Sequence, residues 1–317
     1  IWMVAIFIAL LTIPQFIHND YYILLFNRIF INAIVVLGLN FITGLTGQMN
    51  MGMAGIFALG AYSSALVTKN LDTSPWIGLI VAVIMGLIIG RCLGYPSLRV
   101  KGVYLSLTTI GFAEVIRMLI SNLTNFTGGT QGIRNIKPYS IFGFEFNTQS
   151  RMYYFFLISM CIVIFFAYRI VYSKWGRVFK SLRDNVEAVE MSGVNIAEIK
   201  IKAFTACAIF GSVAGAMYAH FMGYINPSTF SIDLSTNFVI MLVIGGLGSV
   251  FGNIIGAVIV TALPELLKFL GDYYLITFSV IVLLGAIFFP RGWVVLFLDI
   301  AKKIKETILK LSRKEVS

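Results

Sequence analysis

Long apolar stretches recur along this chain from residue 1 to residue 289, and they constrain its fold more than any other feature. A helix needs about 20 consecutive apolar residues to cross a bilayer, and the chain supplies such stretches repeatedly. Only 12% of its residues are charged, against roughly 25% in an ordinary soluble domain. The segment 77–89 is apolar on every face, whereas a strand of a transmembrane barrel alternates apolar and polar side chains. The sequence therefore predicts an all-α, polytopic transmembrane helical bundle.

Polar residues divide the apolar stretches into predicted spans. We expect residues 1–17 to be a first span trimmed at its start rather than a signal peptide, because they lack a small-residue cleavage site. The stretch 237–270 is too long for one untilted span and is interrupted by Gly245-Gly-Leu-Gly-Ser249. A last apolar run covers 274–289. The clear spans lie near 1–17, 22–43, 48–68, 75–95, 103–120, 152–172 and 203–223.

Basic residues predict the orientation of these spans, because short cytoplasmic loops carry an excess of Lys and Arg. Such residues crowd the loop 173–202 and the tail 300–317, so both are predicted to be cytoplasmic. The stretch 237–270 must then cross twice, as a short half-span, a glycine turn and a longer helix. This gives about ten crossings within one transmembrane domain, residues 1–299. The segments predicted to lie outside are 18–21, 69–74 and 121–151.

The predicted cytoplasmic loop has more internal order than a simple connector. Asp184 with Glu187, and Asn195 with Glu198, have the spacing of a capping box, which can begin a helix. Gly193 stands where a first short helix would end. We expect a helix of about two turns, a glycine break, and a second helix that runs into the next span. A solvated charged loop is the plainer alternative, whereas a short helix would be a rigid knob for a cytoplasmic partner.

The same loop carries a short family-type motif. Glu187-Ala188 is followed by Gly193 six residues after the glutamate, and then by an apolar and acidic segment that enters a span. This pattern resembles the "EAA" loop by which importer permeases contact their ATPase subunits. Val189 stands where that motif usually has a second alanine.

Further motifs follow one another in order along the chain. They are Gly44-Leu-Thr-Gly-Gln-Met-Asn-Met-Gly52, Leu98-Arg-Val-Lys-Gly-Val-Tyr-Leu105, Thr109-Ile-Gly-Phe-Ala-Glu-Val-Ile-Arg117, Thr127-Gly-Gly129, Gly245-Gly-Leu-Gly-Ser249 and Phe289-Pro-Arg-Gly292. The series is similar to the permeases of the branched-chain (hydrophobic) amino acid ABC importer family, over residues 38–293. The long outer segment resembles the larger of the two homologous permeases in such systems.

The resemblance implies a multi-pass permease of the bacterial inner membrane that imports leucine, isoleucine or valine, although relatives also carry urea and amides. It implies a homologous permease, two cytoplasmic ATPase subunits and an external solute-binding protein as partners, besides membrane lipids. ATP would be used by the partner subunits, and no cofactor is expected on this chain. The residues that would contact the ATPase are Arg183, Asp184, Asn185, Glu187, Ala188, Gly193, Ile196 and Lys200.

Two glycine clusters and one charged pair are candidates for the translocation path. Glycine in spans most often serves close helix packing, but polar residues accompany both clusters, and exposed backbone at membrane depth needs protein or a water-filled cavity around it. Glu114 and Arg117 stand three residues apart on one helix face, where they can pair, as a structural lock or as a substrate contact. The path candidates are Gly47, Gln48, Asn50, Gly52, Glu114, Gly246 and Ser249.

Several other functions are disfavoured by the sequence. It contains no Gly-x-x-x-x-Gly-Lys-Ser/Thr motif, so a phosphate loop for ATP must lie on another chain. No catalytic cluster or metal-type spacing occurs, and the basic residues sit beside apolar runs rather than in a nucleic-acid patch. The alternatives that remain are a secondary transporter with Glu114 as its ionisable site, or less favourably a membrane enzyme or passive channel.

Overall fold

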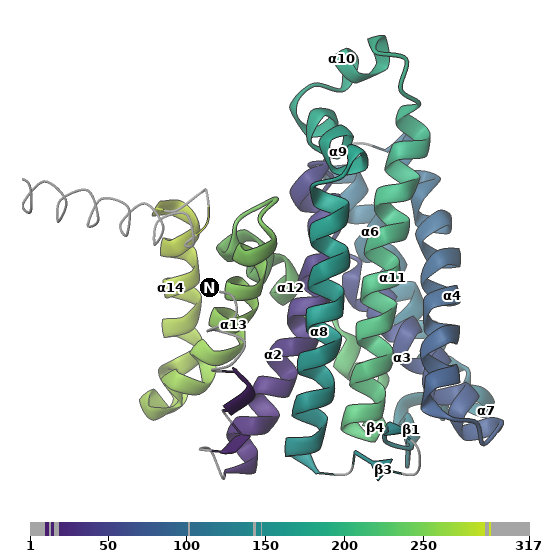
Figure 1. Cartoon of the computed structure of the whole chain (residues 1–317), viewed down its shortest axis with the longest axis vertical. Coiled ribbons are helices and arrows are strands. Elements are labelled where there is room, and N and C mark those ends of the chain that lie inside the picture. The colour runs from purple at the N-terminus through teal and green to yellow at the C-terminus, as the bar shows by residue number, and fades with distance from the viewer. Residues whose placement is uncertain are drawn as a thin grey trace, which may run out of the picture.

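The computed structural model describes residues 10–12, 14–15, 19–100, 102–141, 144–146, 148–288 and 292. Over this part the chain is a bundle of helices with a few two-residue strands (Figure 1). Within these described residues, six helices are long and apolar enough to cross a membrane, which confirms the predicted fold class. They cover Asp20–Leu45, Pro75–Arg99, Val103–Asn122, Gln149–Val171, Ile196–Met222 and Val250–Gly285. The count of about ten crossings stays a prediction, because most of the first predicted span lies outside the described residues.

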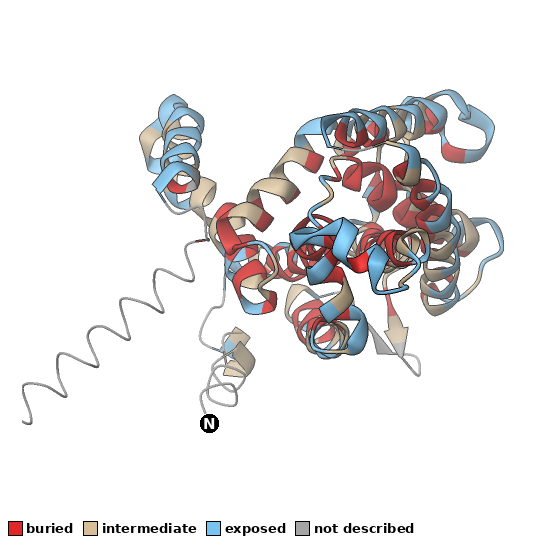
Figure 2. Cartoon of the chain, turned by 90° about the horizontal axis from the view of Figure 1, so that it is seen from above, coloured by how far each residue is buried: buried red, intermediate tan, exposed pale blue. Residues whose placement is uncertain are grey.

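The centre of the bundle is formed by α11 (Ile196–Met222), which packs against α3 (Met53–Asn70) and α4 (Pro75–Gly94). Small residues allow these helices to approach closely, as is usual between membrane helices. A Cβ atom on Gly215 of α11 would lie 2.0 Å from the Phe57 carbonyl oxygen of α3, and one on Gly90 of α4 would lie 2.4 Å from Thr205 Cα. The buried residues gather inside this bundle, seen in red in Figure 2.

The first apolar stretch after Asn19 is one helix with an irregular end. α2 (Asp20–Leu39) continues as the π-helix η1 (Asn40–Leu45), and α3 begins only at Met53. The predicted start of a span at residue 48 is therefore wrong, because the polar and glycine residues 46–52 interrupt the helix. Single π-helical turns are uncommon in proteins, and those that do occur are often found at functional sites.

The stretch 237–270 forms two helices with a glycine turn between them, as the sequence predicted. α12 (Ile232–Gly245) is a short helix of 14 residues, and α13 (Val250–Leu266) is longer. The turn needs left-handed backbone, with φ of 98° at Gly246 and 87° at Gly248, which only glycine adopts without strain. The 3₁₀ segment η4 (Leu267–Tyr273) then leads to α14 (Tyr274–Phe288), which stands beside the main bundle.

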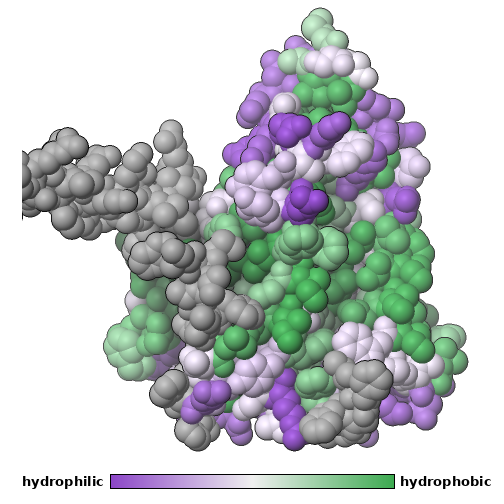
Figure 3. All heavy atoms as spheres, viewed as in Figure 1, coloured by the Kyte–Doolittle hydropathy of each residue, from purple (hydrophilic) through white to green (hydrophobic). Residues whose placement is uncertain are grey.

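The predicted cytoplasmic loop 173–202 and the predicted outer segment 121–151 lie at opposite ends of the bundle (Figure 1). One end carries α9 (Lys174–Asp184) and α10 (Val186–Met191), which follow α8 (Gln149–Val171). Hydrophilic residues gather at both ends, and the surface between them is mostly hydrophobic (Figure 3). The elements near the other end are α7 (Thr124–Thr127), η2 (Gly129–Gln131), β1 (Ile133–Arg134), β2 (Ser140–Ile141), β3 (Phe144–Glu145), β4 (Tyr224–Ile225) and η3 (Pro227–Phe230).

The predicted outer segment 121–151 is more ordered than a surface loop. β1 pairs antiparallel with β4, which directly follows α11, and the register sets Ile133 opposite Ile225. Both isoleucine side chains are buried. The pairing attaches the outer segment to the central helix. The remaining elements are α5 (Pro96–Arg99) and α6 (Val103–Asn122), which connect α4 to this segment.

Candidate functional site

Side-chain caps begin α9, α10 and α11 at the end of the bundle that is predicted to be cytoplasmic, which is called the inner end below. The Ser173 hydroxyl accepts a hydrogen bond from the Gly176 N–H at the start of α9. The Asn195 side chain accepts one from the Glu198 N–H at the start of α11, as predicted. The predicted cap at Asp184 is wrong by one residue. Asp184 is the last residue of α9, and the following Asn185 caps α10 by accepting from the Ala188 N–H at 3.0 Å.

The eleven-residue helix α9 was not predicted from the sequence. Its apolar residues Phe179 and Leu182 are buried three positions apart, whereas Lys180 and Ser181 between them are exposed. The amphipathic pattern carries the helix through Asp184 and so displaces the cap. Gly193, with φ of 75°, follows α10 as predicted.

The predicted ATPase-contact residues separate into an exposed tip and a buried base. Asp184, Asn185, Glu187, Ala188 and Gly193 are exposed around α10. Ile196 is half-buried, and Lys200 is only 9% exposed within α11. Met191, at the end of α10, is 91% exposed. The tip is thus the part of the loop that a partner could reach.

Arg183 differs from the other members of this set, because its side chain turns toward the bundle. Its guanidinium Nη1 donates a hydrogen bond of 2.8 Å to the carbonyl oxygen of Gly44, in η1. A Cβ atom on Gly47 would lie 3.0 Å from Arg183 Cγ, so the absence of a side chain at residue 47 makes room for the arginine. Arg183 therefore links α9 directly to the broken span.

The two glycine clusters, far apart in sequence, meet at this point. The Gly248 N–H donates a hydrogen bond of 2.8 Å to Asn40 Oδ1 of the π-helix. A Cβ atom on Gly44 would lie 2.8 Å from the Gly248 nitrogen, and one on Gly292 would lie 2.5 Å from Gly246 Cα. We call this contact region the inner junction; it comprises Asn40, Gly44, Gly47, Arg183, Gly246, Gly248 and Gly292.

The non-helical residues 46–52 obtain hydrogen-bond partners from neighbouring side chains. The Met51 N–H donates to Thr109 Oγ1 of α6 at 3.1 Å, and the Gly52 N–H donates to Asn50 Oδ1 at 2.8 Å. The Ala54 N–H, at the free start of α3, donates to Ser235 Oγ of α12 at 2.8 Å. Irregular backbone at membrane depth requires such partners. Thr109 and Ser235 were not predicted, since a lone hydroxyl within an apolar helix is a weak signal.

The path candidates divide between two neighbouring places. Gly47 and Gly246 belong to the inner junction, and Ser249 caps the adjoining helix α13 through the Gly252 N–H. Asn50 is fully buried and Gly52 lies against α6, where its added Cβ atom would be 2.4 Å from the Thr109 carbonyl oxygen. Gln48 lies half-buried between these two groups in the sequence.

Glu114 lies farther along α6, and its predicted pairing with Arg117 is confirmed. Arg117 Nε donates to Glu114 Oε2 at 3.0 Å, and the side chains are 26% and 34% exposed for Glu114 and Arg117. α6 packs against α3, but much of its remaining surface is exposed, including Tyr104, Leu107 and Val115. The ion pair thus lies on a helix face that the described part of the chain leaves open.

The outer end is fastened by His220, near the end of α11. Its Nδ1 donates to the carbonyl oxygen of Lys137 at 2.6 Å, because a carbonyl can only accept. Nε2 is then the acceptor for the Ser64 hydroxyl, at 2.8 Å. Lys137 also forms an ion pair with Asp72. The hydrogen bond from the Lys137 ammonium is the main reason why the pKa of the Asp72 carboxyl lies below its usual value. His220 therefore joins α11 to the outer segment through Nδ1 and to α3 through Nε2.

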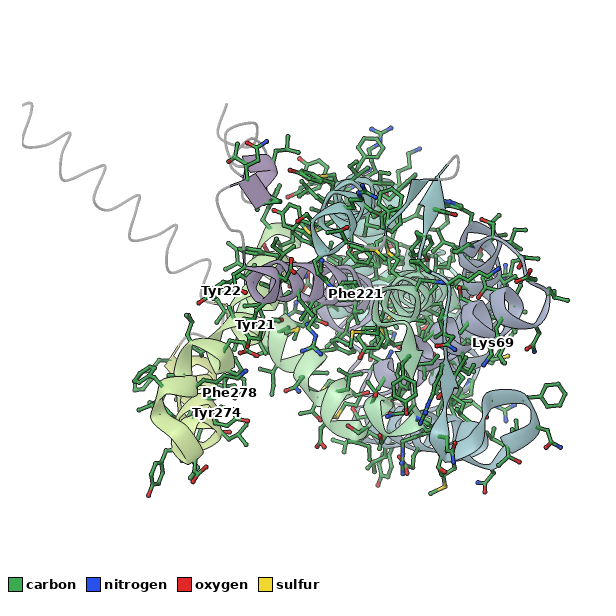
Figure 4. The ribbon with its side chains drawn as sticks, turned by 90° about the horizontal axis from the view of Figure 1, so that it is seen from below. Tyr21, Tyr22, Lys69, Phe221, Tyr274 and Phe278 are labelled. Atoms are coloured by element: carbon green, nitrogen blue, oxygen red, sulfur yellow. The ribbon has the colours of Figure 1, made fainter. Side chains whose placement is uncertain are left out.

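A second contact closes the same end beside α14. Lys268 Nζ donates to the Tyr21 hydroxyl at 2.8 Å and pairs with Glu265, so the start of α2 is attached to the end of α13. Figure 4, viewed from below, labels Tyr21 and Tyr22 here and Lys69 on the far side of the bundle. Among the described residues, no group of three His, Cys, Asp or Glu could hold a metal ion.

Comparison with known proteins identifies the family. The sequence profile of the family described as "Branched-chain amino acid transport system / permease component" matches residues 21–289. The chain belongs to this family. The permease is accordingly a multi-pass protein of the bacterial inner membrane, as the resemblance implied.

Individual relatives include both permease types of these systems. The permease is 31% identical to the high-affinity branched-chain amino acid transport system permease protein LivM of Escherichia coli, over 83% of this chain and 67% of the relative. It is 24% identical to a probable LivM of Methanocaldococcus jannaschii, over 84% of each chain. It is 24% identical to LivH of Escherichia coli, over 72% of this chain and 78% of the relative. No solved structure matches the permease.

Proposed function

We propose that the permease is the membrane-spanning subunit of an ATP-driven importer of branched-chain or other hydrophobic amino acids. Two cytoplasmic ATPase subunits use the ATP, and this chain neither catalyses a reaction nor holds a cofactor. An external solute-binding protein delivers the substrate at the segment 121–151. The LivM relatives are named as branched-chain amino acid transport permeases, which supports this class of substrate.

The observation that carries the proposal is the continuous contact from the exposed tip to the broken span. α10 is exposed on most of its surface, and α9 connects it to Arg183. Arg183 is hydrogen-bonded to the Gly44 carbonyl, and the Gly248 N–H is hydrogen-bonded to Asn40 of the same π-helix. A push on α10 would therefore reach both interruptions of the transmembrane helices through α9 and these two hydrogen bonds.

A homologous permease completes the path along α6. A lone charge at mid-bilayer costs roughly 2.5–3.5 kcal/mol on insertion scales, and intramembrane charges usually face protein or a water-filled cavity. The Glu114–Arg117 pair is partly exposed on the surface of this chain, so lipid contact there would be unfavourable. We infer that the second permease covers this face and that the substrate passes between the two subunits.

Changes at the tip test the coupling. Glu187→Ala removes the exposed acid, and Gly193→Val strains a backbone with φ of 75°. Both variants should remain in the membrane but lose most ATP-dependent leucine uptake, whereas Lys174→Ala, an exposed cation on α9, should keep it. Normal uptake in both tip variants would count against the proposal. Ion-driven uptake in liposomes by the permease alone, without ATP, would instead identify a secondary transporter.

Exchange of the α6 charges separates a path role from a structural lock. Glu114→Ala leaves Arg117 without its carboxylate, so the amount of inserted protein should fall, because a lone intramembrane charge costs roughly 2.5–3.5 kcal/mol. The double variant Glu114→Arg/Arg117→Glu should regain insertion, measured by surface labelling, but not leucine uptake. If the exchange restored both quantities, the pair would be only a structural lock.

A further inference from the structure

The outward face of α8 forms an apolar column. Ile158, Ile162, Phe165 and Phe166 are each more than half exposed, at 56%, 52%, 61% and 55%. Residues spaced by three, four and seven positions lie on one side of a helix. In a membrane protein such a face contacts lipid chains.

Aromatic rings and cations from α8 and α9 lie at the end of this column that is nearest to α9. Tyr168 and Tyr172 stack with ring centroids 4.3 Å apart. Lys180, on α9, sets its Nζ 5.6 Å from the Tyr172 ring centroid. Arg169 lies three residues before Tyr172 in the last turn of α8 and is exposed. Two cations from separate elements therefore flank one pair of tyrosines.

The positive charges of Arg169 and Lys180 are not neutralised by acidic residues within the described part of the chain. No Asp or Glu occurs between residues 149 and 183. Arg169 and Lys180 form no ion pair with a described residue, whereas Lys202 of α11 pairs with Glu198 and covers the Trp175 ring. Tyrosine and basic side chains at the end of a span are typical of the level of lipid headgroups.

We propose that Arg169, Lys180, Tyr168 and Tyr172 form a binding site for one anionic phospholipid of the inner leaflet. An acyl chain lies along the apolar column, and the phosphate lies between the two cations, where the tyrosine hydroxyls can donate to it. This site goes beyond the proposed function, because it concerns the membrane rather than the substrate or the ATPase. It also places a lipid against α9, the helix that holds Arg183.

Another inner-leaflet cluster provides a matched control. Arg91 and Arg99 flank the exposed Tyr95 at the end of α4, beside an apolar face. No described cation from a second helix lies over that tyrosine ring. Arg91→Gln/Arg99→Gln removes the same charge from the same leaflet as Arg169→Gln/Lys180→Gln. A general attraction to anionic lipid would be weakened equally by both double variants.

The test is native mass spectrometry of the permease in nanodiscs that contain phosphatidylglycerol and phosphatidylcholine in equal amounts. Each basic residue near an anionic surface contributes roughly fivefold, so Arg169→Gln/Lys180→Gln should lower the occupancy of one retained phosphatidylglycerol about 25-fold. Arg91→Gln/Arg99→Gln and the charge-conserving Arg169→Lys/Lys180→Arg should retain it.

Three outcomes would overturn the site. Equal losses in both glutamine double variants would mean a diffuse basic belt, and retained lipid in Arg169→Gln/Lys180→Gln would mean no site at these residues. If that variant instead lost binding of the ATPase subunits in nanodiscs of phosphatidylcholine alone, the cations would serve protein docking. None of these outcomes depends on the substrate or on uptake, so the lipid site and the proposed import function can fail separately.

Discussion

Arg183→Ala should strongly reduce leucine uptake while the ATPase subunits still associate with the permease. The substitution removes the hydrogen bond from a charged donor to the Gly44 carbonyl. Such bonds contribute about 1.5–3 kcal/mol, and the carbonyl would lose its partner. Because the tip of α10 is unchanged, docking should persist, but movement of α9 would no longer reach the broken span. Uptake should fall by about tenfold or more.

Two comparisons make this prediction specific to the link. Arg183→Lys can still donate to one carbonyl and should keep part of the uptake, whereas Lys174→Ala at the opposite end of α9 should behave like the unchanged protein. Uptake and co-purification of the ATPase subunits are measured on the same membranes. If Arg183→Ala lost the ATPase subunits as well, the arginine would be a docking residue and the link to Gly44 would be incidental.

Gly44→Ala should destabilise the inner junction and also abolish uptake. The new Cβ atom would lie 1.9 Å from Asn40 Oδ1 and 2.8 Å from the backbone nitrogen of Gly248. Asn40 would have to leave its hydrogen bond with Gly248, and the turn itself would have to move. Overpacking typically costs about 1–3 kcal/mol, so the thermal unfolding midpoint of the purified permease should fall by several degrees.

Gly111→Ala is the matched comparison for stability. Gly111 lies in α6 with no atom within 4 Å of its added Cβ, so the same change meets no obstacle there. Alanine is favoured over glycine in a helix interior by roughly 0.8–1.0 kcal/mol, and the midpoint should stay the same or rise. An unchanged midpoint in Gly44→Ala would mean that the two breaks do not pack as tightly as the inner junction requires.

The helices of this permease could be predicted because each apolar stretch carries its own signal. The division of 237–270 into α12, a turn and α13 followed from Gly246 and Gly248 together with the charge asymmetry of the loops. α9 was missed because its apolar residues are few and its charges gave the loop the composition of a solvated segment. The misplaced cap at Asp184 has the same origin, since nothing local shows where α9 ends.

The contacts between motifs could not be read from the sequence. Each glycine cluster predicted a break, but only the fold brings Gly44 beside Gly248 and sets Gly292 against Gly246. Arg183 was predicted to contact the ATPase, but its hydrogen bond to a carbonyl 139 positions away depends on tertiary packing. The roles of the coupling and path residues stay predictions until variants are measured.

Labelling at Met191 tests most directly whether the tip faces the cytoplasm and receives the ATPase. Met191→Cys, with Cys92, Cys161 and Cys207 replaced by alanine, presents a single thiol at a position that is 91% exposed. A membrane-impermeant maleimide should label it in inverted vesicles but not in intact cells, and bound ATPase subunits should slow the labelling. Labelling in intact cells, or labelling in inverted vesicles that the ATPase subunits leave unchanged, would contradict the proposed coupling.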